Sequence, residues 1–373
     1  MTATLRCAQC GREFEDDGRR TRCDCGGMLD VHFEPTFKPA MVSGRRYDLW
    51  RYREALPVGD DIVTLGEGWT PLLPIPFDGR HLLVKQEQLF PTGSYKDRGA
   101  AILMTHLREL GVKRVVEDSS GNAGCAVAAY AARAGIEADI YVPEGAASAK
   151  TQQIEAYGAS LHHIHGTRED TARAALAAAS SCAYASHVYN PWFLQGTKTF
   201  AYEVAEQLGW TAPEALVLPA GNGTLLLGAY LGFSELLQAG VIQRMPRLVA
   251  VQASACAPLA AAFAEGQEEP ALVSTSATAA EGIAIASPAR GAQILAAVRA
   301  TGGLFVAVSE DEIVASLREC CRRGWFIEPT AAAVIAGARR YACTAVLGET
   351  IVTAFTGHGL KAPAEIAELT RSL

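Results

Sequence analysis

Short apolar runs alternate with longer, often alanine-rich segments along most of the chain. Each run holds four to six residues, many of them β-branched, which is typical of buried strands. Strands are expected at residues 114–117, 138–142, 160–164, 215–218, 248–252, 303–308 and 350–355. Helices are expected at residues 95–110, 122–134, 149–157, 169–181, 194–208, 224–239, 311–323 and 330–341. This alternation predicts an α/β fold with a largely parallel sheet.

The length of the chain indicates more than one core. Its 373 residues exceed the roughly 100 to 200 residues of an ordinary domain. Residues 1–34 are set apart by crowded cysteines and by the lack of a sustained apolar period. We expect a small knuckle at residues 1–34, a large domain at 35–97 and 187–373, and a small α/β domain at 98–186.

Charge and hydropathy argue against two classes of partner. The formal net charge is −7, from 33 basic and 40 acidic residues, and neither sign forms a block that would attract a phosphate backbone. No apolar run reaches the length of about 18 residues that a membrane-spanning helix needs. We therefore expect no nucleic-acid partner and no membrane partner, and the cytoplasm is the expected location.

Ten cysteines divide into six scattered ones and four near the start of the chain, which are Cys7, Cys10, Cys23 and Cys25. In a cytosolic chain the scattered cysteines are expected to be small buried apolar residues, and the crowded ones predict a metal site. Four thiolates suffice for a tetrahedral zinc site with a structural role. The spacing from Cys23 to Cys25 is one residue short of the usual knuckle, so a metal-free ribbon is the alternative.

Lys96 lies at the start of a predicted helix, just after the turn-forming residues Pro91, Thr92 and Gly93. Partial burial beside the positive end of a helix favours the neutral amine, which is the nucleophilic form of lysine. Lys96 is therefore the candidate nucleophile of the chain. The alternative is an exposed Lys-Asp-Arg trio that merely opens a helix.

Two turns of small residues each connect a predicted strand to a predicted helix. Residues 119–124 read Ser-Ser-Gly-Asn-Ala-Gly, and residues 221–224 read Gly-Asn-Gly-Thr. Backbone N–H groups at the positive end of a helix suit an anion, so we expect a carboxylate at the first turn and a phosphate at the second. A tight turn with Asn122 as helix cap is the alternative for the first. The second lacks the three-glycine fingerprint of a dinucleotide site.

The last predicted strand is followed by residues 356–361, which read Thr-Gly-His-Gly-Leu-Lys. Ligands of parallel sheets bind at the carboxyl ends of the strands, where the hydroxyl of Thr356 could face a ring nitrogen. We interpret His358 as a structural residue.

Together these motifs resemble those of threonine synthase and its relatives among the fold-type II pyridoxal phosphate enzymes. The resemblance extends from the cysteine knuckle through residues 67–72 (Glu-Gly-Trp-Thr-Pro-Leu) and the Lys96 segment to residues 356–361. It implies two α/β domains with parallel-sheet cores and helices on both faces, the larger of which binds pyridoxal 5′-phosphate. It also implies a homodimer and a lyase reaction close to the conversion of O-phospho-L-homoserine and water to L-threonine and phosphate.

The resemblance also implies a role for each candidate residue. Lys96 would bond covalently to the cofactor's aldehyde and, once released, would move protons on the substrate. Asn122 would bind the ring hydroxyl oxygen. Thr356 would contact the pyridine nitrogen and leave it largely unprotonated, which favours elimination and replacement over transamination. The cofactor's phosphate would be held by Gly221, Asn222, Gly223 and Thr224. The substrate's carboxylate would be held by Ser119, Ser120, Gly121 and Ala123.

The chain departs from the threonine synthase pattern at Phe193. Those enzymes usually carry an arginine there that helps to bind the substrate's phosphate, and phenylalanine has no such donors. Lys198 remains as a phosphate-binding candidate. An alternative function is therefore a serine or threonine dehydratase, an ammonia-lyase, or a synthase that uses an unphosphorylated amino acid. A non-catalytic adaptor protein is a remote alternative.

Overall fold

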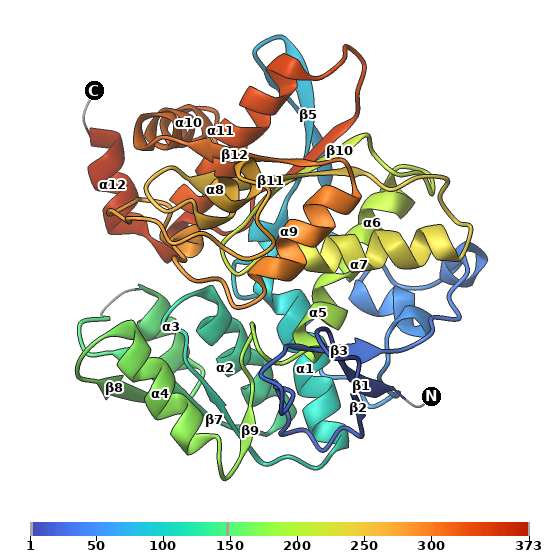
Figure 1. The fold of residues 1–373 in the computed structure, drawn as a ribbon, viewed down its shortest axis with the longest axis vertical. Coiled ribbons are helices and arrows are strands. Elements are labelled where there is room, and N and C mark those ends of the chain that lie inside the picture. Colours follow the sequence, from blue (N-terminus) through green and yellow to red (C-terminus); the bar gives the residue numbers. More distant parts are fainter. Residues whose placement is uncertain (1–2, 147–148, 372–373) are drawn as a thin grey trace. The chain divides into compact units, whose positions relative to one another are not determined.

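A computed structural model describes residues 3–146 and 149–371 of the chain (Figure 1). The chain divides into two compact units. Unit 1 contains Met1–Trp69 and Phe90–Thr199, and unit 2 contains Thr70–Leu89 and Phe200–Leu373. Each unit has its own sheet and its own apolar core, and the predicted α/β fold is confirmed. Within the described residues, no helix is both long and apolar enough to span a bilayer.

Unit 1 is built on a four-stranded parallel sheet. Its strands, in the order β8-β7-β6-β9, are Ser160–Ile164, Glu137–Pro143, Arg114–Glu117 and Ala183–Tyr184. Successive side chains of a strand point to opposite faces, and three consecutive residues of β6 are buried, so both faces of the sheet are covered.

The helices of unit 1 pack around this sheet. They are α1 (Lys96–Glu109), α2 (Asn122–Ala134), α3 (Ala149–Ala156), α4 (Arg168–Ala178) and α5 (Trp192–Thr197), with 3-10 turns at Pro39–Val42 and Leu49–Ala55. Helices α2 and α4 pack on β7, and α1 packs on both α2 and α5. Helix α2 ends at Gly135, which has a left-handed backbone (φ 70°), and α4 begins with a capping box formed by Thr167 and Asp170.

The N-terminal part of unit 1 is a small antiparallel sheet that the sequence analysis did not predict. Its strands, in the order β2-β1-β3, are Glu13–Phe14, Thr4–Cys7 and Leu29–His32. Asp16 follows β2 and attaches this ribbon to two helices. One carboxylate oxygen of Asp16 lies 2.7 Å from Nε2 of His106 on α1 and also accepts a hydrogen bond from Trp192 on α5. The rings of His106 and Trp192 stack at 3.4 Å.

Unit 2 is built on a six-stranded sheet in the order β12-β11-β10-β13-β5-β4. These strands are Leu304–Val308, Arg247–Ala253, Ala215–Pro219, Ile351–Ala354, Arg80–Lys85 and Leu72–Phe77. All neighbours are parallel except β4 and β5, which form an antiparallel hairpin. Asp78 (φ 49°) and Gly79 (φ 74°) connect the two strands of the hairpin.

The helices of unit 2 are α6 (Thr199–Gln207), α7 (Thr224–Gln238), α8 (Pro258–Ala264), α9 (Gly291–Ala300), α10 (Glu310–Arg322), α11 (Pro329–Thr344) and α12 (Pro363–Arg371), with 3-10 turns at Glu87–Leu89, Glu281–Ile283 and Gly359–Lys361. The expectation of one helix at residues 194–208 is wrong, because α5 ends at Thr197 and α6 begins at Thr199. The break is confined to Lys198, whose backbone angles (φ −62°, ψ −22°) stay in the helical region.

Candidate active site

Lys96 is the first residue of α1, and the turn that precedes it is held by Asp97. The backbone N–H of Thr92 donates to Oδ2 of Asp97 at 2.9 Å, and the Thr92 hydroxyl donates to Oδ1. The side chain of Lys96 is half-buried between aromatic rings. Its Nζ lies 4.8 Å from the ring centroid of Tyr95 and 5.6 Å from that of Phe193. The amine thus lies half-buried at the start of a helix, where the sequence analysis expects it.

Residues 119–121 belong to the turn between β6 and α2 in unit 1, and residues 122–124 are the first three residues of α2. Gly121 is the residue before the helix, and its N–H donates to the hydroxyl of Ser119 at 3.2 Å. Ser120, Gly121 and Asn122 are half-buried, whereas Ser119 and Ala123 are buried. The first N–H groups of a helix have no acceptor within the helix, so this turn can bind a carboxylate.

Two acidic residues just before this turn were missed by the sequence analysis. Glu117 and Asp118 end β6 and enter the turn, and both are buried. Asp118 accepts a hydrogen bond from the hydroxyl of Tyr184 at 2.7 Å and pairs with Arg168 at 3.3 Å. Oε1 of Glu117 lies 2.8 Å from Nδ1 of His187. No pattern in the sequence marks these two acids, because acidic residues are mostly exposed and their burial depends on contacts distant in sequence.

Burial dominates the electrostatics of Glu117 and His187. Burial and the negative charge of Asp118 raise the pKa of Glu117 well above its ordinary value, against the opposing effects of Arg168 and Lys96. Burial and the positive charges of Lys96 and Arg168 lower the pKa of His187 well below its ordinary value. Both shifts favour the neutral form of each side chain at neutral pH.

Phe193, which stands where threonine synthases usually carry an arginine, is fully buried against α1. A Cβ atom added to Gly99 would lie 2.2 Å from its ring, so the absence of a side chain on α1 makes room for Phe193. Lys198, predicted to bind substrate, is buried at the end of α5 with Nζ 5.6 Å from the ring centroid of Phe33. The role of Lys198 in substrate binding stays a prediction.

The glycine turn at residues 221–224 lies in unit 2, between the carboxyl end of β10 and the start of α7. Gly223 has a left-handed backbone (φ 70°) directly before the helix, a conformation that glycine adopts without strain. A Cβ on Gly221 would lie 3.0 Å from the carbonyl oxygen of Gly282. The backbone at Gly223 thus favours glycine, and a side chain at Gly221 would be tightly packed. The turn offers a phosphate the N–H groups and the positive end of a 15-residue helix.

Thr356 lies at the same edge of the sheet of unit 2 as this glycine turn. Strands β10 and β13 pair in parallel, so their carboxyl ends meet, and Thr356 follows β13 as a buried residue. Nδ1 of His358 accepts a hydrogen bond from the N–H of Leu360 at 3.1 Å, and burial lowers the pKa of this histidine. This contact supports a structural role for His358.

The two turns, the amine and the hydroxyl fit pyridoxal phosphate in their chemistry. In unit 1, Lys96 supplies an amine for the aldehyde, and Asn122 supplies an amide for the ring hydroxyl. In unit 2, the glycine turn supplies donors for the phosphate, and Thr356 supplies a hydroxyl for the ring nitrogen. Each of these positions remains a predicted binding residue.

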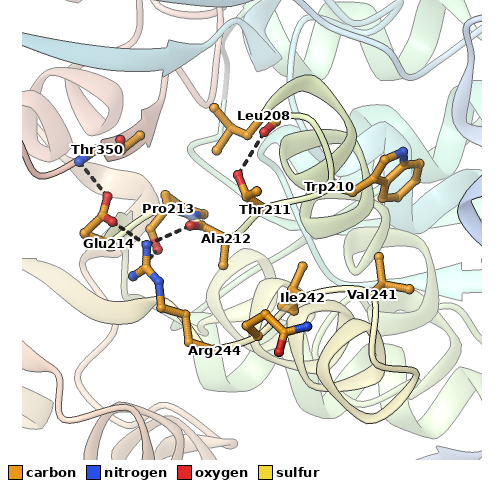
Figure 2. A pocket seen from close by; sticks show the side chains of 11 residues that line it. Leu208, Trp210, Thr211, Ala212, Pro213, Glu214, Val241, Ile242, Arg244 and Thr350 are labelled. Carbon is orange, nitrogen blue, oxygen red and sulfur yellow. Dashed lines mark hydrogen bonds and ion pairs between the residues drawn. The ribbon is translucent and has the colours of Figure 1, made fainter.

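A cavity of about 310 Å³ elsewhere in unit 2 has a different character (Figure 2). It lies at the amino ends of β10 and β13, because Glu214 and Thr350 directly precede these strands. Oε2 of Glu214 accepts from the N–H of Thr350 at 2.8 Å, and the guanidinium of Arg244 binds Glu214 and the carbonyl oxygens of Ala212 and Pro213. The cavity's charged groups thus pair with one another, at the edge of the sheet opposite to the glycine turn.

The four clustered cysteines come together in the ribbon. The Sγ atoms of Cys7, Cys10, Cys23 and Cys25 all lie within 4.8 Å of one another. The backbone N–H of Cys10, which donates to Sγ of Cys7 at 3.4 Å, lowers the pKa of the Cys7 thiol to about 6. A backbone hydrogen bond from Gly27 lowers the pKa of Cys25, but hydrogen bonds from neighbouring thiols and burial raise it to about 12, so the convergence of the four sulfur atoms is what fits a metal ion.

The fold and the predicted site define a fold-type II pyridoxal phosphate enzyme. Residues 63–357 match the family described as "Pyridoxal-phosphate dependent enzyme", and the chain belongs to this family. The prediction that the protein is an enzyme of the lyase type is thereby confirmed.

Individual relatives agree with this result. The chain is 34% identical to a threonine synthase of Methanocaldococcus jannaschii, in an alignment that covers 96% of this chain and 93% of that relative. The fold is similar to that of threonine deaminase isoform 2 from Solanum lycopersicum, with a TM-score of 0.68, 23% identity and coverage of 90% of both chains. It is also similar to an L-serine ammonia-lyase from Rhizomucor miehei, with a TM-score of 0.69, 24% identity and coverage of 81% and 98%.

Proposed function

We propose that the protein catalyses elimination and replacement on an amino acid, in a reaction most like that of threonine synthase. The substrate would then be O-phospho-L-homoserine, which reacts with water to give L-threonine and phosphate. The similarity to the M. jannaschii threonine synthase carries this proposal, because it covers 96% of the chain. The position of Lys96 at the start of α1 supports it.

Bound pyridoxal phosphate supplies an electron sink that stabilises negative charge on the substrate's α carbon. The chain's own residues do the rest in this proposal. The turn at residues 119–123 binds the substrate's carboxylate, and the amine of Lys96 takes and returns protons. The turn at residues 221–224 binds the cofactor's phosphate, and the Thr356 hydroxyl keeps the pyridine nitrogen largely unprotonated.

A second candidate function is elimination from an unphosphorylated amino acid, as a dehydratase, an ammonia-lyase or a related synthase performs it. Phe193 favours this candidate, because its buried ring near Lys96 offers no donor to a phosphate. The buried acid Glu117 also favours it, because hydroxyl and amine leaving groups need a proton to depart.

A substrate panel separates the two candidates. The cofactor-loaded protein is incubated with O-phospho-L-homoserine, L-serine, L-threonine and 2,3-diaminopropionate, and phosphate, threonine and ammonia are measured. Release of phosphate with formation of threonine at high efficiency supports the threonine synthase reaction and eliminates the alternative. Release of ammonia from serine, threonine or diaminopropionate, without turnover of O-phospho-L-homoserine, supports the alternative and eliminates the threonine synthase reaction.

We also propose that the cysteine cluster binds a structural zinc ion. The four Sγ atoms within 4.8 Å of one another support this, although the close spacing of Cys23 and Cys25 is unusual. Elemental analysis of protein produced without added metal tests it, and about one zinc per chain is expected. The homodimer, the cytoplasmic location and the assignment of cofactor binding to the larger domain stay predictions.

A further inference from the structure

Glu117 lies directly before the turn that is proposed to bind the substrate's carboxylate. Its side chain is fully buried at the carboxyl end of β6. Oε1 lies 2.8 Å from His187, but Oε2 makes no hydrogen bond to any residue that the structure describes. A buried carboxyl oxygen without a partner is costly, and it is rare unless a ligand or a proton completes the site.

The neighbours of Glu117 connect it to the Lys96 region. The ring of His187 contacts the edge of the Phe193 ring at 6.0 Å between centroids, and Nζ of Lys96 lies 5.6 Å from the centroid of the same ring. Glu117, His187, Phe193 and Lys96 therefore form a continuous group within unit 1.

The charges that face this pair determine where its proton resides. A negative charge on Glu117 is repelled by Asp118 and attracted by Lys96 and Arg168. The same two cations, Lys96 and Arg168, repel a positive charge on His187. Tyr184 donates to Asp118 and also faces the two acids. Burial outweighs the attractions, so Glu117 holds its proton and His187 stays neutral. The geometry then leaves one buried oxygen of a carboxylic acid without a hydrogen-bond partner among the described residues.

We infer that Glu117 is a buried proton donor that acts alongside Lys96 and protonates the departing hydroxyl or amine of an unphosphorylated amino-acid substrate. This inference rests on the second candidate function, elimination from an unphosphorylated amino acid. Lys96 takes the proton from the α carbon, and that C–H electron pair forms the new carbon–carbon double bond. The bond from carbon to the leaving oxygen or nitrogen breaks with its electron pair, which takes the proton of Glu117 to give water or ammonia. The surplus proton on Lys96 then restores Glu117. His187 is the positioning residue that holds Oε1 of the acid.

Leaving-group dependence provides the test, with Glu117→Gln as the variant. L-serine has a hydroxyl leaving group that needs a proton, whereas β-chloro-L-alanine loses chloride without one. We expect Glu117→Gln to lower kcat/KM with L-serine by about 10²-fold or more and with β-chloro-L-alanine by only a few fold. The matched control is Glu310→Gln, which alters an acid in unit 2 that also has an oxygen without a described partner. Equal losses with both substrates overturn the inference.

Infrared spectroscopy of the cofactor-free protein gives a readout that needs no turnover. A band from a protonated carboxylic acid is expected at neutral pH in the wild type and in Glu310→Gln but not in Glu117→Gln. Absence of the band in the wild type overturns the inference. If Glu117→Gln does not fold, His187→Asn is measured instead. The wild-type rate with L-serine is expected to fall at high pH, and in His187→Asn this fall is expected at a different pH.

The outcomes also separate this inference from the proposed function. A wild-type enzyme that turns over O-phospho-L-homoserine but no hydroxyl or amine substrate overturns the role of Glu117 and leaves the threonine synthase reaction standing. A wild-type protein that turns over no amino acid overturns both.

Discussion

Lys96 and Phe193 show how single residues determine the chemistry of unit 1. The half-buried amine lies near two aromatic rings at the positive end of α1, where it is partly removed from water. The fully buried Phe193 ring adds an apolar surface where a phosphorylated substrate would call for charge. The predicted covalent role of Lys96 is common to both candidate functions, whereas Phe193 favours the second candidate, because its ring offers no donor to a phosphate.

Replacement of Lys96 by alanine is the direct test of its role at the residue scale. We expect Lys96→Ala to lose covalent attachment of the cofactor after borohydride reduction and to lower kcat by about 10³-fold or more. Mass spectrometry of the reduced protein and steady-state assays measure the two effects. Lys150→Ala is the control, because Lys150 lies on α3 and not in a predicted site. Equal function of wild type and Lys96→Ala in cells would favour the non-catalytic adaptor.

Glu117 shows what sequence reasoning could not find at this scale. An acidic residue at the end of a strand is usually solvated, and the sequence alone does not reveal that His187, 70 positions later, buries and binds this one. The two strand-to-helix turns themselves were predictable, because glycine and small polar residues between a strand and a helix are typical of turns. Burial of a charged group depends instead on contacts distant in sequence.

Packing of α1 against α5 is the principal contact at the scale of elements, because it holds the Lys96 region in place. Gly99 on α1 faces the ring of Phe193 on α5. The ribbon is attached to the same two helices through Asp16, His106 and Trp192. A change in the ribbon or in the α1–α5 contact is therefore expected to affect the position of Lys96.

A methyl group on Gly99 tests this packing. Gly99→Ala would place a carbon 2.2 Å from the Phe193 ring, and we expect a loss of about 1–3 kcal/mol in the free energy of unfolding. Combining it with Phe193→Leu is expected to restore part of that loss, since leucine leaves room at the contact. Urea unfolding of the single and double variants measures the coupling.

Gly145→Ala is the control, because a Cβ there meets nothing within 4 Å. Additive effects would show that the two residues do not press on each other.

Asp16 makes the attachment of the ribbon dependent on pH. Burial alone raises the pKa of Asp16, but the hydrogen bond and charge of His106 outweigh it, so the pKa lies below its ordinary value of 3.8. A carboxyl group whose pKa is lowered by folding stabilises the folded state at pH values above its ordinary pKa. This contribution to stability is lost as the pH falls through the lower pKa of the folded state. We expect Asp16→Asn to cost about 1–3 kcal/mol at neutral pH.

Urea unfolding at neutral and acidic pH measures this effect. The difference between wild type and Asp16→Asn should shrink as the pH falls below about 3.8. Asp17→Asn is the matched control, because Asp17 is exposed and binds only the N–H groups of Arg19 and Arg20. A difference that stays constant with pH would show that the charge of Asp16 is not what attaches the ribbon.

The elements themselves were predictable where local signals were complete. Helix α2 begins and ends at the predicted residues, because Gly121 precedes it and Gly135 ends it with a left-handed turn. The hairpin of β4 and β5 was missed because Pro74 and Pro76 argue against a strand, although Asp78-Gly79 is a strong hairpin signal. Strand β4 tolerates both prolines because it is at the edge of its sheet.

For the molecule as a whole, the division of the chain follows packing and not the order of the motifs. Residues 187–199 belong to unit 1 with residues 1–69 and 90–97, whereas the sequence analysis expected residues 35–97 and 187–199 in the large domain. The reason is physical, since α5 packs on α1, and the ribbon is attached to both. Periodicity reveals helices and strands but does not show which of them share a core.

Removal of the metal tests whether the ribbon is a separate part of the molecule. Because the ribbon buries only a small cluster around Leu5, Cys7, Cys23 and Leu29, it has too little apolar core to be stable alone. We expect Cys10→Ser, or a strong chelator, to release zinc and to remove the protection of β1 and β3 against hydrogen exchange. Strands β10 and β11 of unit 2 should keep their protection, because their core contains no ribbon residue.

Cys343→Ser is the control, since Cys343 is exposed and outside the cluster. Unchanged exchange in β1 and β3 after complete loss of the metal would show that the ribbon folds without it.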